Sequence, residues 1–132
     1  MRVLVDTHAL IWYVLGDRAK LSGPAIGALA ALQNELYVSA ASAWEIATKV
    51  RLGKMAPIPG LTGGSFAQNV RALGFRLASI TIDDAQIAGE LPVPHRDPFD
   101  RMLLAQAQRL GALVTNERPL FASFGLPVTL IW

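Results

Sequence analysis

Five acidic residues share one kind of position in this sequence. Each either follows the carboxyl end of a predicted strand or lies in the first turn of the helix that leaves it; they are Asp6, Glu45, Asp97, Asp100 and Glu117. In open α/β sheets this edge is where ligands bind. Two carboxylates roughly 5 Å apart repel by about 3 kcal/mol at an effective dielectric of 20. A cluster of them therefore needs either a proton or a cation between its members.

The donor types indicate which cation that would be. The chain has no cysteine, so thiolate ligands are excluded and the candidate donors are carboxylate oxygens. Such oxygens favour a hard ion, Mg²⁺ or Mn²⁺. A hard divalent ion that is held by a few carboxylates and keeps some of its water ligands is suited to catalysing reactions at phosphoryl groups.

Each acid also has a purely structural interpretation. Asp6 could simply cap the helix after it, and Ser42-Ala43-Trp44-Glu45 fits a capping box. Asp97 is a good N-cap, and Asp100 could complete the same device. Glu117 could be a solvated residue early in a short helix. Capping explains each acid singly, whereas the convergence of these acids on one sheet edge is better explained by a site.

The elements that position these acids alternate along the chain. Arg2–Asp6 is an apolar run without alternation that stops at a carboxylate, which is typical of a strand buried on both faces of a parallel sheet. Further strands are predicted at 36–38, 76–82, 112–115 and 128–132. Helices are predicted at 7–15, 23–33, 42–52, up to about 73, 83–91, 98–110 and about 120–124. This alternation predicts a single α/β domain, residues 1–132, with a parallel sheet and helices on both faces.

Composition limits the class of protein. The 132 residues are 52% hydrophobic and 17% charged, which excludes disorder and leaves apolar surface for an interface. The formal charge of +2 permits contact with nucleic acid without requiring it. The absence of cysteine suits a reducing compartment. We find no signal peptide and no run long enough to span a bilayer, and therefore expect a cytoplasmic protein without membrane contact.

Four blocks of this sequence resemble a known family. They are Leu-Val-Asp-Thr-His-Ala-Leu-Ile-Trp at 4–12, Val-Ser-Ala-Ala-Ser-Ala-Trp-Glu-Ile-Ala-Thr-Lys at 38–49, His-Arg-Asp-Pro-Phe-Asp-Arg-Met-Leu-Leu-Ala-Gln-Ala at 95–107 and Leu-Val-Thr-Asn-Glu at 113–117. In this order they resemble the PIN-domain ribonucleases, specifically the VapC-type toxins of bacterial toxin–antitoxin pairs. The resemblance spans nearly the whole chain.

This resemblance implies a fold and an activity. The fold is a five-stranded parallel sheet in the order 3-2-1-4-5, and the activity is Mg²⁺- or Mn²⁺-dependent cleavage of RNA. It also implies a homodimer and neutralisation by a cognate antitoxin protein. By position, Asp6, Glu45 and Asp100 match the three acids of the family's metal site. Glu117 falls where the family usually has a fourth acid, most often Asp, so its longer side chain is expected to contribute from the outer sphere.

Polar residues next to these acids have both a site role and a structural role open to them. Thr7, Thr115 and Asn116 could hydrogen-bond a ligand or water, and caps and turns explain them equally well. Asp97 matches a position that accompanies the site, and its cap role comes first.

Basic residues also lie close to these acids in the sequence. Arg96 and Arg101 adjoin the predicted site and are candidates for RNA phosphate contacts. Lys49 lies four residues after Glu45, so we expect an ion pair on the helix surface. His8 is expected to point away from Asp6 once the helix has started.

Other function classes remain open on the sequence alone. A metal-dependent phosphatase with Asp6 as nucleophile would want a second Asp two residues later, where this chain has His8. A receiver domain would need a lysine near its end, and no lysine follows Lys54. A catalytically weak, PIN-like module could use its acidic pocket to bind an Arg or Lys of a partner protein.

Overall fold

A central parallel sheet organises the protein. The computed structural model describes residues 1–132. The strands are β1 (Arg2–Val5), β2 (Glu35–Ser39), β3 (Arg76–Ala78), β4 (Ala112–Val114) and β5 (Thr129–Ile131), in the spatial order β3-β2-β1-β4-β5. Every neighbouring pair is parallel. The α/β class, the parallel sheet and the order 3-2-1-4-5 are thereby confirmed.

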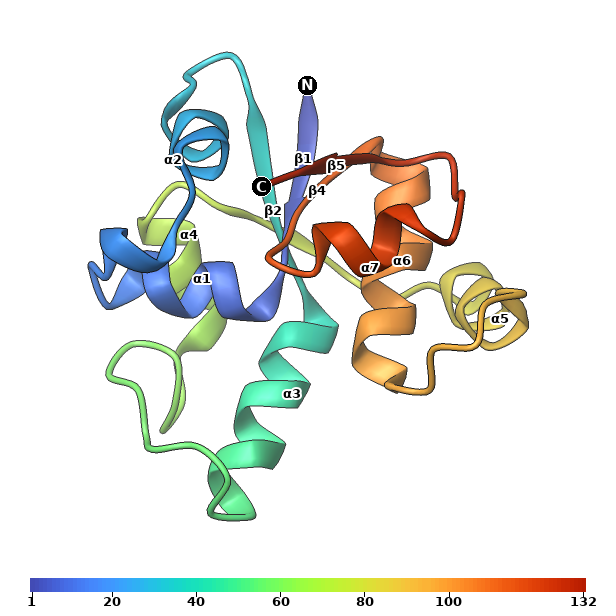
Figure 1. Cartoon of the computed structure of the whole chain (residues 1–132). Coiled ribbons are helices and arrows are strands. Elements are labelled where there is room, and N and C mark those ends of the chain that lie inside the picture. The colour runs from blue at the N-terminus through green and yellow to red at the C-terminus, as the bar shows by residue number, and fades with distance from the viewer.

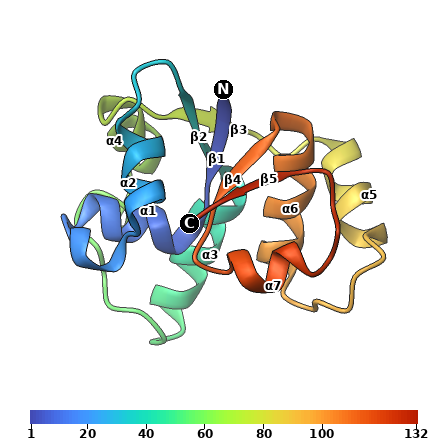
Figure 2. The same cartoon turned by 45° about the horizontal axis from the view of Figure 1, so that its top comes forward.

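Helices cover both faces of this sheet (Figure 1, Figure 2). They are α1 (Thr7–Val14), α2 (Gly23–Ala30), α3 (Ala40–Arg51), α4 (Phe66–Ala72), α5 (Ile82–Glu90), α6 (Pro98–Leu110) and α7 (Arg118–Ala122), with a short 3-10 helix at Arg18–Lys20. In Figure 1, α1, α2 and α4 lie to the left of the strands, α5, α6 and α7 lie to the right, and α3 extends downward from the end of β2. No helix is long and apolar enough to cross a bilayer.

The unbroken apolar run of β1 has a direct structural cause. Val3 and Val5 pack into one core cluster with residues of α1, α2 and α4, while Leu4 packs into a second cluster with residues of α6. Successive side chains of a strand point to opposite faces, so a strand covered on both sides must be apolar at every position. β1 pairs with β2 on one side and β4 on the other, which makes it the centre of the sheet.

The start of α3 differs from the prediction. The helix begins at Ala40, and Ser39 caps it by accepting a hydrogen bond from the Ala41 amide at 2.9 Å. Ser42 therefore lies inside the first turn, where its Oγ accepts from Thr7 Oγ1 at 3.0 Å. The predicted capping box of Ser42 and Glu45 is wrong, and the Glu45 carboxylate is not used to cap its own helix.

Other boundaries shift by a few residues. The cap of α5 is Thr81 rather than the Asp83-Asp84 pair, and it forms a reciprocal capping box with Asp84. β3 ends at Ala78, and α7 begins at Arg118, two residues before the predicted start. The predicted caps Ser22 and Asp97, each with a proline in the first turn of its helix, are confirmed.

Candidate functional site

Asp6 is a buried acid at the carboxyl edge of the sheet. It follows β1, is only 5% exposed, and its Oδ1 accepts a hydrogen bond from the Ala9 amide at 2.8 Å as the N-cap of α1. Burial raises its pKa from 3.8 to about 6, although hydrogen bonds from Thr115 and from the Ala9 amide act in the opposite direction. The cap interpretation of Asp6 is correct, yet capping alone leaves this carboxylate costly to ionise.

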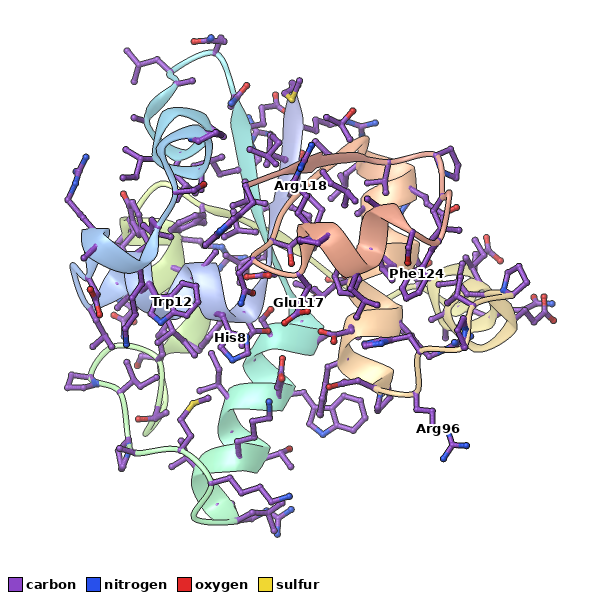
Figure 3. All side chains as sticks on the ribbon, viewed as in Figure 1. His8, Trp12, Arg96, Glu117, Arg118 and Phe124 are labelled. Carbon is purple, nitrogen blue, oxygen red and sulfur yellow. The ribbon has the colours of Figure 1, made fainter.

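All five acids singled out in the sequence line one small hollow. Its volume is about 50 Å³, and no hydrophobic residue lines it. The lining residues are Asp6, Thr7, His8, Glu45, Lys49, Asp97, Asp100 and Glu117. They come from α1, α3, α6 and α7 and the residues that cap these helices, and Figure 3 shows His8 and Glu117 near each other where α1 and α7 approach the start of α3. The structure therefore brings together every acid that the sequence predicted to meet.

Glu45 points into this hollow from the first turns of α3. It is 3% exposed, and its Oε2 lies 2.6 Å from Lys49 Nζ, one helical turn later. The ion pair expected from the spacing is present. Because Lys49 also lines the hollow, its ammonium group offsets part of the negative charge there.

Asp100 is paired with a histidine to which the sequence analysis assigned no role. His95 Nε2 lies 2.8 Å from Asp100 Oδ2. The pKa of Asp100 is raised by burial, and by the charges of Asp97 and Glu45, while the hydrogen bond and charge of His95 oppose the rise. His95 lies in an irregular segment, so no periodicity marks it, and its only signal was its place at the start of the third motif block.

Asp97 performs the cap role predicted for it. Its Oδ1 accepts hydrogen bonds from the amides of Phe99 at 2.8 Å and Asp100 at 3.3 Å at the start of α6. Asp100 does not complete that cap, because its Oδ2 faces His95. Asp97 thus fixes the helix end that carries Asp100 toward the hollow.

The predicted supporting residues mostly hold backbone and helices in place. Thr115 is fully buried, and its Oγ1 accepts from the Glu117 amide at 3.0 Å. Thr7 donates to Ser42 and so ties α1 to α3. The Oδ1 of Asn116 is buried without a hydrogen-bond partner. Glu117 is exposed, and its side chain makes no capping hydrogen bond to α7.

Arg101, predicted as a candidate for substrate phosphate, instead has its guanidinium group engaged by the protein's own backbone. Its guanidinium group donates to five backbone carbonyls at 2.8 to 3.2 Å, which belong to Ala88, Gly89, Leu91, Val93 and His95. Three of these carbonyls, those of Ala88, Gly89 and Leu91, lie at the carboxyl end of α5, where carbonyl groups have no helical amide donor. Arg101 is therefore the clamp that shapes the segment carrying His95.

Arg96 and His8 differ from Arg101 in being exposed. Arg96 points away from the body of the protein in Figure 3, and no hydrogen bond or ion pair holds its side chain. His8 also lines the hollow, although we expected it not to share the direction of Asp6. The hollow lies at the amino end of α1, where side chains of the first turn border it whichever way they face around the helix axis.

The donor set of the hollow fits a hard divalent cation. It offers carboxylate oxygens and no sulfur, and burial raises the pKa of two of its acids, Asp6 and Asp100, with a smaller contribution from neighbouring carboxylates. As the side chains stand, no three acidic or histidine groups lie close enough to form a complete ligand set. Glu45 is held by Lys49 and Asp100 by His95, so ligation by either acid would compete with that partner.

Comparisons with known proteins agree with this architecture. A family model described as the PIN domain matches residues 3–123. A comparison with curated proteins gave no match.

Similar folds occur among solved structures. One is the crystal structure of VapBC2 from Rickettsia felis bound to a DNA fragment from its promoter, with a TM-score of 0.68 and 14% identity over 98% of this chain and 97% of that chain. A second is DNA-bound VapBC from Salmonella typhimurium, with a TM-score of 0.59 and 12% identity over 98% and 96%. A third is VapBC-1 from nontypeable Haemophilus influenzae, with a TM-score of 0.54 and 15% identity over 98% and 96%.

Proposed function

Because this chain belongs to the PIN-domain family, we propose that it is a metal-dependent endoribonuclease and the toxin of a VapC-type toxin–antitoxin pair. The observation that carries this proposal is the convergence of five acids on one polar hollow at the carboxyl edge of the sheet. Nothing in the capping of individual helices requires Glu45, Asp100 and Glu117 to face the same space as Asp6.

Asp6, Asp100 and Glu45 would hold Mg²⁺ or Mn²⁺. When bound, such an ion makes water a stronger nucleophile and offsets the charge that grows on the phosphoryl and leaving oxygens. Asp6 is suited to this role because the cap of α1 fixes its orientation. The cap that Asp97 forms does the same for the helix end carrying Asp100. Glu45 is either a ligand or the group that orients the attacking water.

The remaining groups at the hollow would act around these three acids. Glu117, at the exposed rim, would contribute from the outer sphere. Lys49 keeps the Glu45 carboxylate in one place through its ion pair. Arg96, with a free guanidinium group, remains a candidate for a phosphate of the RNA. The family resemblance implies that water attacks the phosphorus and the 3′-oxygen leaves, so the products would carry 5′-phosphate and 3′-hydroxyl ends.

The proposal extends to partners and compartment. The solved structures with a similar fold are VapBC complexes, which supports a cognate antitoxin for this chain. We expect an antitoxin to place a basic side chain against the acidic hollow. The resemblance also implies a homodimer, whose interface would bury some of the apolar surface that a 52% hydrophobic chain exposes. The substrate would be cytoplasmic RNA.

A cleavage assay tests this function. Purified protein is incubated with end-labelled RNA in Mg²⁺, in Mn²⁺ and in EDTA, and the ends of the products are mapped. We expect cleavage with either metal, none in EDTA, and none from Asp6→Asn. The matched control is Asp83→Asn, an exposed acid on α5, which should cleave normally. If Asp6→Asn cleaves at the unmodified rate, the site assignment is wrong; if the unmodified protein never cleaves, the PIN-fold partner-binding module is the better description.

A further inference from the structure

A row of aromatic rings begins at the rim of the acidic hollow. His8 lines the hollow, and its ring lies 5.7 Å from that of Trp12, tilted by 37°. Trp12 in turn lies 5.9 Å from Trp132, which follows β5, at a tilt of 54°. Figure 3 shows His8 beside Glu117 and Trp12 farther along α1. We call these three residues, His8, Trp12 and Trp132, the aromatic row.

Core packing explains only part of this row. Trp12 and Trp132 are half-buried against the core cluster of the α1 face, so each keeps part of its surface in solvent. His8 is exposed and belongs to neither core cluster. His8 and Trp12 are four residues apart and so share one side of α1, while the buried side is formed by Ala9, Leu10 and Ile11. The most exposed member of the row is thus His8, which borders the acidic hollow.

A cationic side chain flanks the row. Arg118 opens α7 directly after Glu117, is exposed, and its Nε lies 3.4 Å from the carbonyl oxygen of Leu130. Leu130 lies on β5, two residues before Trp132. Arg118 thus follows one residue of the hollow, Glu117, and its guanidinium group contacts the strand that leads to Trp132.

We propose that the aromatic row is a stacking surface for unpaired bases of single-stranded RNA. Aromatic rings beside a cationic group are how proteins hold single strands, because every base has a face that stacks and every linkage has a phosphate. In this arrangement the base next to the cleaved phosphate lies on His8, and the following base lies toward Trp12. Duplex RNA, whose bases already stack on one another, cannot use the row.

This inference rests on the proposed nuclease function for its substrate class, and it is tested by binding rather than cleavage. Asp6→Asn protein, which should leave RNA intact, is titrated into a fluorescein-labelled single-stranded 12-nucleotide RNA and into the same RNA annealed to its complement. Fluorescence anisotropy gives the Kd of each. His8→Ala should weaken single-strand binding about tenfold, as expected for loss of one stacked base. Duplex binding should be weaker from the start and unchanged by the substitution.

Matched variants separate stacking from charge and from general damage. His8→Phe keeps a ring and should retain affinity, whereas His8→Lys keeps a cation and should not. Tyr13→Leu removes the next aromatic side chain of α1, which packs edge-on against Phe75 and lies outside the row, and should bind as the parent does. All variants are checked for folding by circular dichroism.

The outcomes also distinguish this inference from the proposed function. If the unmodified protein cleaves RNA but His8→Ala binds the single strand as tightly as its parent, the stacking surface is refuted and the nuclease stands. Equal losses for single-stranded and duplex RNA would refute it as well. If the unmodified protein does not cleave but His8→Ala still loses single-strand binding and His8→Phe keeps it, the stacking surface stands and the nuclease assignment fails.

Discussion

Asp6→Asn should make the metal-free protein more stable while removing its activity. The pKa of Asp6 is raised from 3.8 to about 6 by burial, and each unit corresponds to about 1.4 kcal/mol. Keeping this carboxylate ionised in the folded protein at pH 7 therefore costs about 3 kcal/mol. Asparagine carries no charge, and its Oδ1 can still accept the hydrogen bond of the Ala9 amide. Allowing about 1 kcal/mol for an imperfectly paired side-chain amide leaves a net gain of about 2 kcal/mol.

The pH dependence of this gain follows from the direction of the shift. A carboxyl group with a raised folded pKa stabilises the protein below its unfolded pKa, and this contribution is lost as the pH rises from about 4 to about 6. The difference between Asp6→Asn and the unmodified protein should therefore be largest at pH 7 and above. It should vanish or reverse at pH 4, where Asp6 is protonated in the folded state.

Urea unfolding in EDTA, followed by tryptophan fluorescence between pH 4 and pH 8, measures this difference. Asp83→Asn, an exposed acid of α5, is the control and should change the free energy of unfolding by less than about 0.5 kcal/mol. The reasoning is refuted if Asp6→Asn is the less stable protein at pH 7, or if its stability difference is the same at pH 4 and pH 7.

Two further predictions concern the residues that frame the site. Arg101→Ala removes five hydrogen bonds to half-buried or exposed carbonyls and should lower the free energy of unfolding by about 3 kcal/mol. Arg96→Ala, five residues earlier, removes no side-chain hydrogen bond and should change it little. Equal unfolding midpoints for the two variants would contradict the clamp. Arg109→Ala should cost about 3 kcal/mol because it leaves the buried Asp84 carboxylate without its ion pair. Burial raises the pKa of Asp84, but hydrogen bonds from Arg109 and Thr81 hold it below its usual value. The contribution of this pair should therefore be complete above the ordinary pKa of 3.8 and be lost only as the pH falls further. A contribution that already disappears between pH 6 and pH 5 in urea titrations would be inconsistent with this assignment.

Local patterns were sufficient to predict a parallel sheet and the starts of α1, α2 and α6, while the strand order came from the family resemblance. The apolar run of β1 indicated a strand covered on both faces, and the Asp97-Pro98 pair located the start of α6. The serines at 39 and 42 show the limit of such patterns, since both can cap a helix. The pairing of β2 with β1 and β3 keeps the backbone extended through Ser39, and so the cap falls there.

The contacts that sequence reasoning missed all depend on tertiary placement. Arg101 donates to carbonyls up to thirteen residues away in an irregular segment, and no spacing rule describes such a clamp. His95 reaches Asp100 only because this segment is held in shape. The position of His8 follows from the hollow lying at the end of α1, which becomes visible only when four elements are assembled around it.

The acids were easier to predict than their partners. A carboxylate at the end of a predicted strand can be recognised from the sequence, because parallel strands must bring such positions to one edge. Whether Lys49 or a cation neutralises Glu45 depends on distances within the assembled hollow. The same is true of whether the buried Oδ1 of Asn116 finds a hydrogen-bond donor.

Binding of Mn²⁺ tests the central claim, that these acids form a divalent-cation site, most directly. Electron paramagnetic resonance of free Mn²⁺ gives the bound fraction as protein is titrated, with no need for an RNA substrate. The unmodified protein should bind Mn²⁺, Asp6→Asn and Asp100→Asn should each bind at least tenfold more weakly, and Asp83→Asn should bind normally. Equal Mn²⁺ binding by all four proteins, or none by the unmodified protein, would contradict the claim.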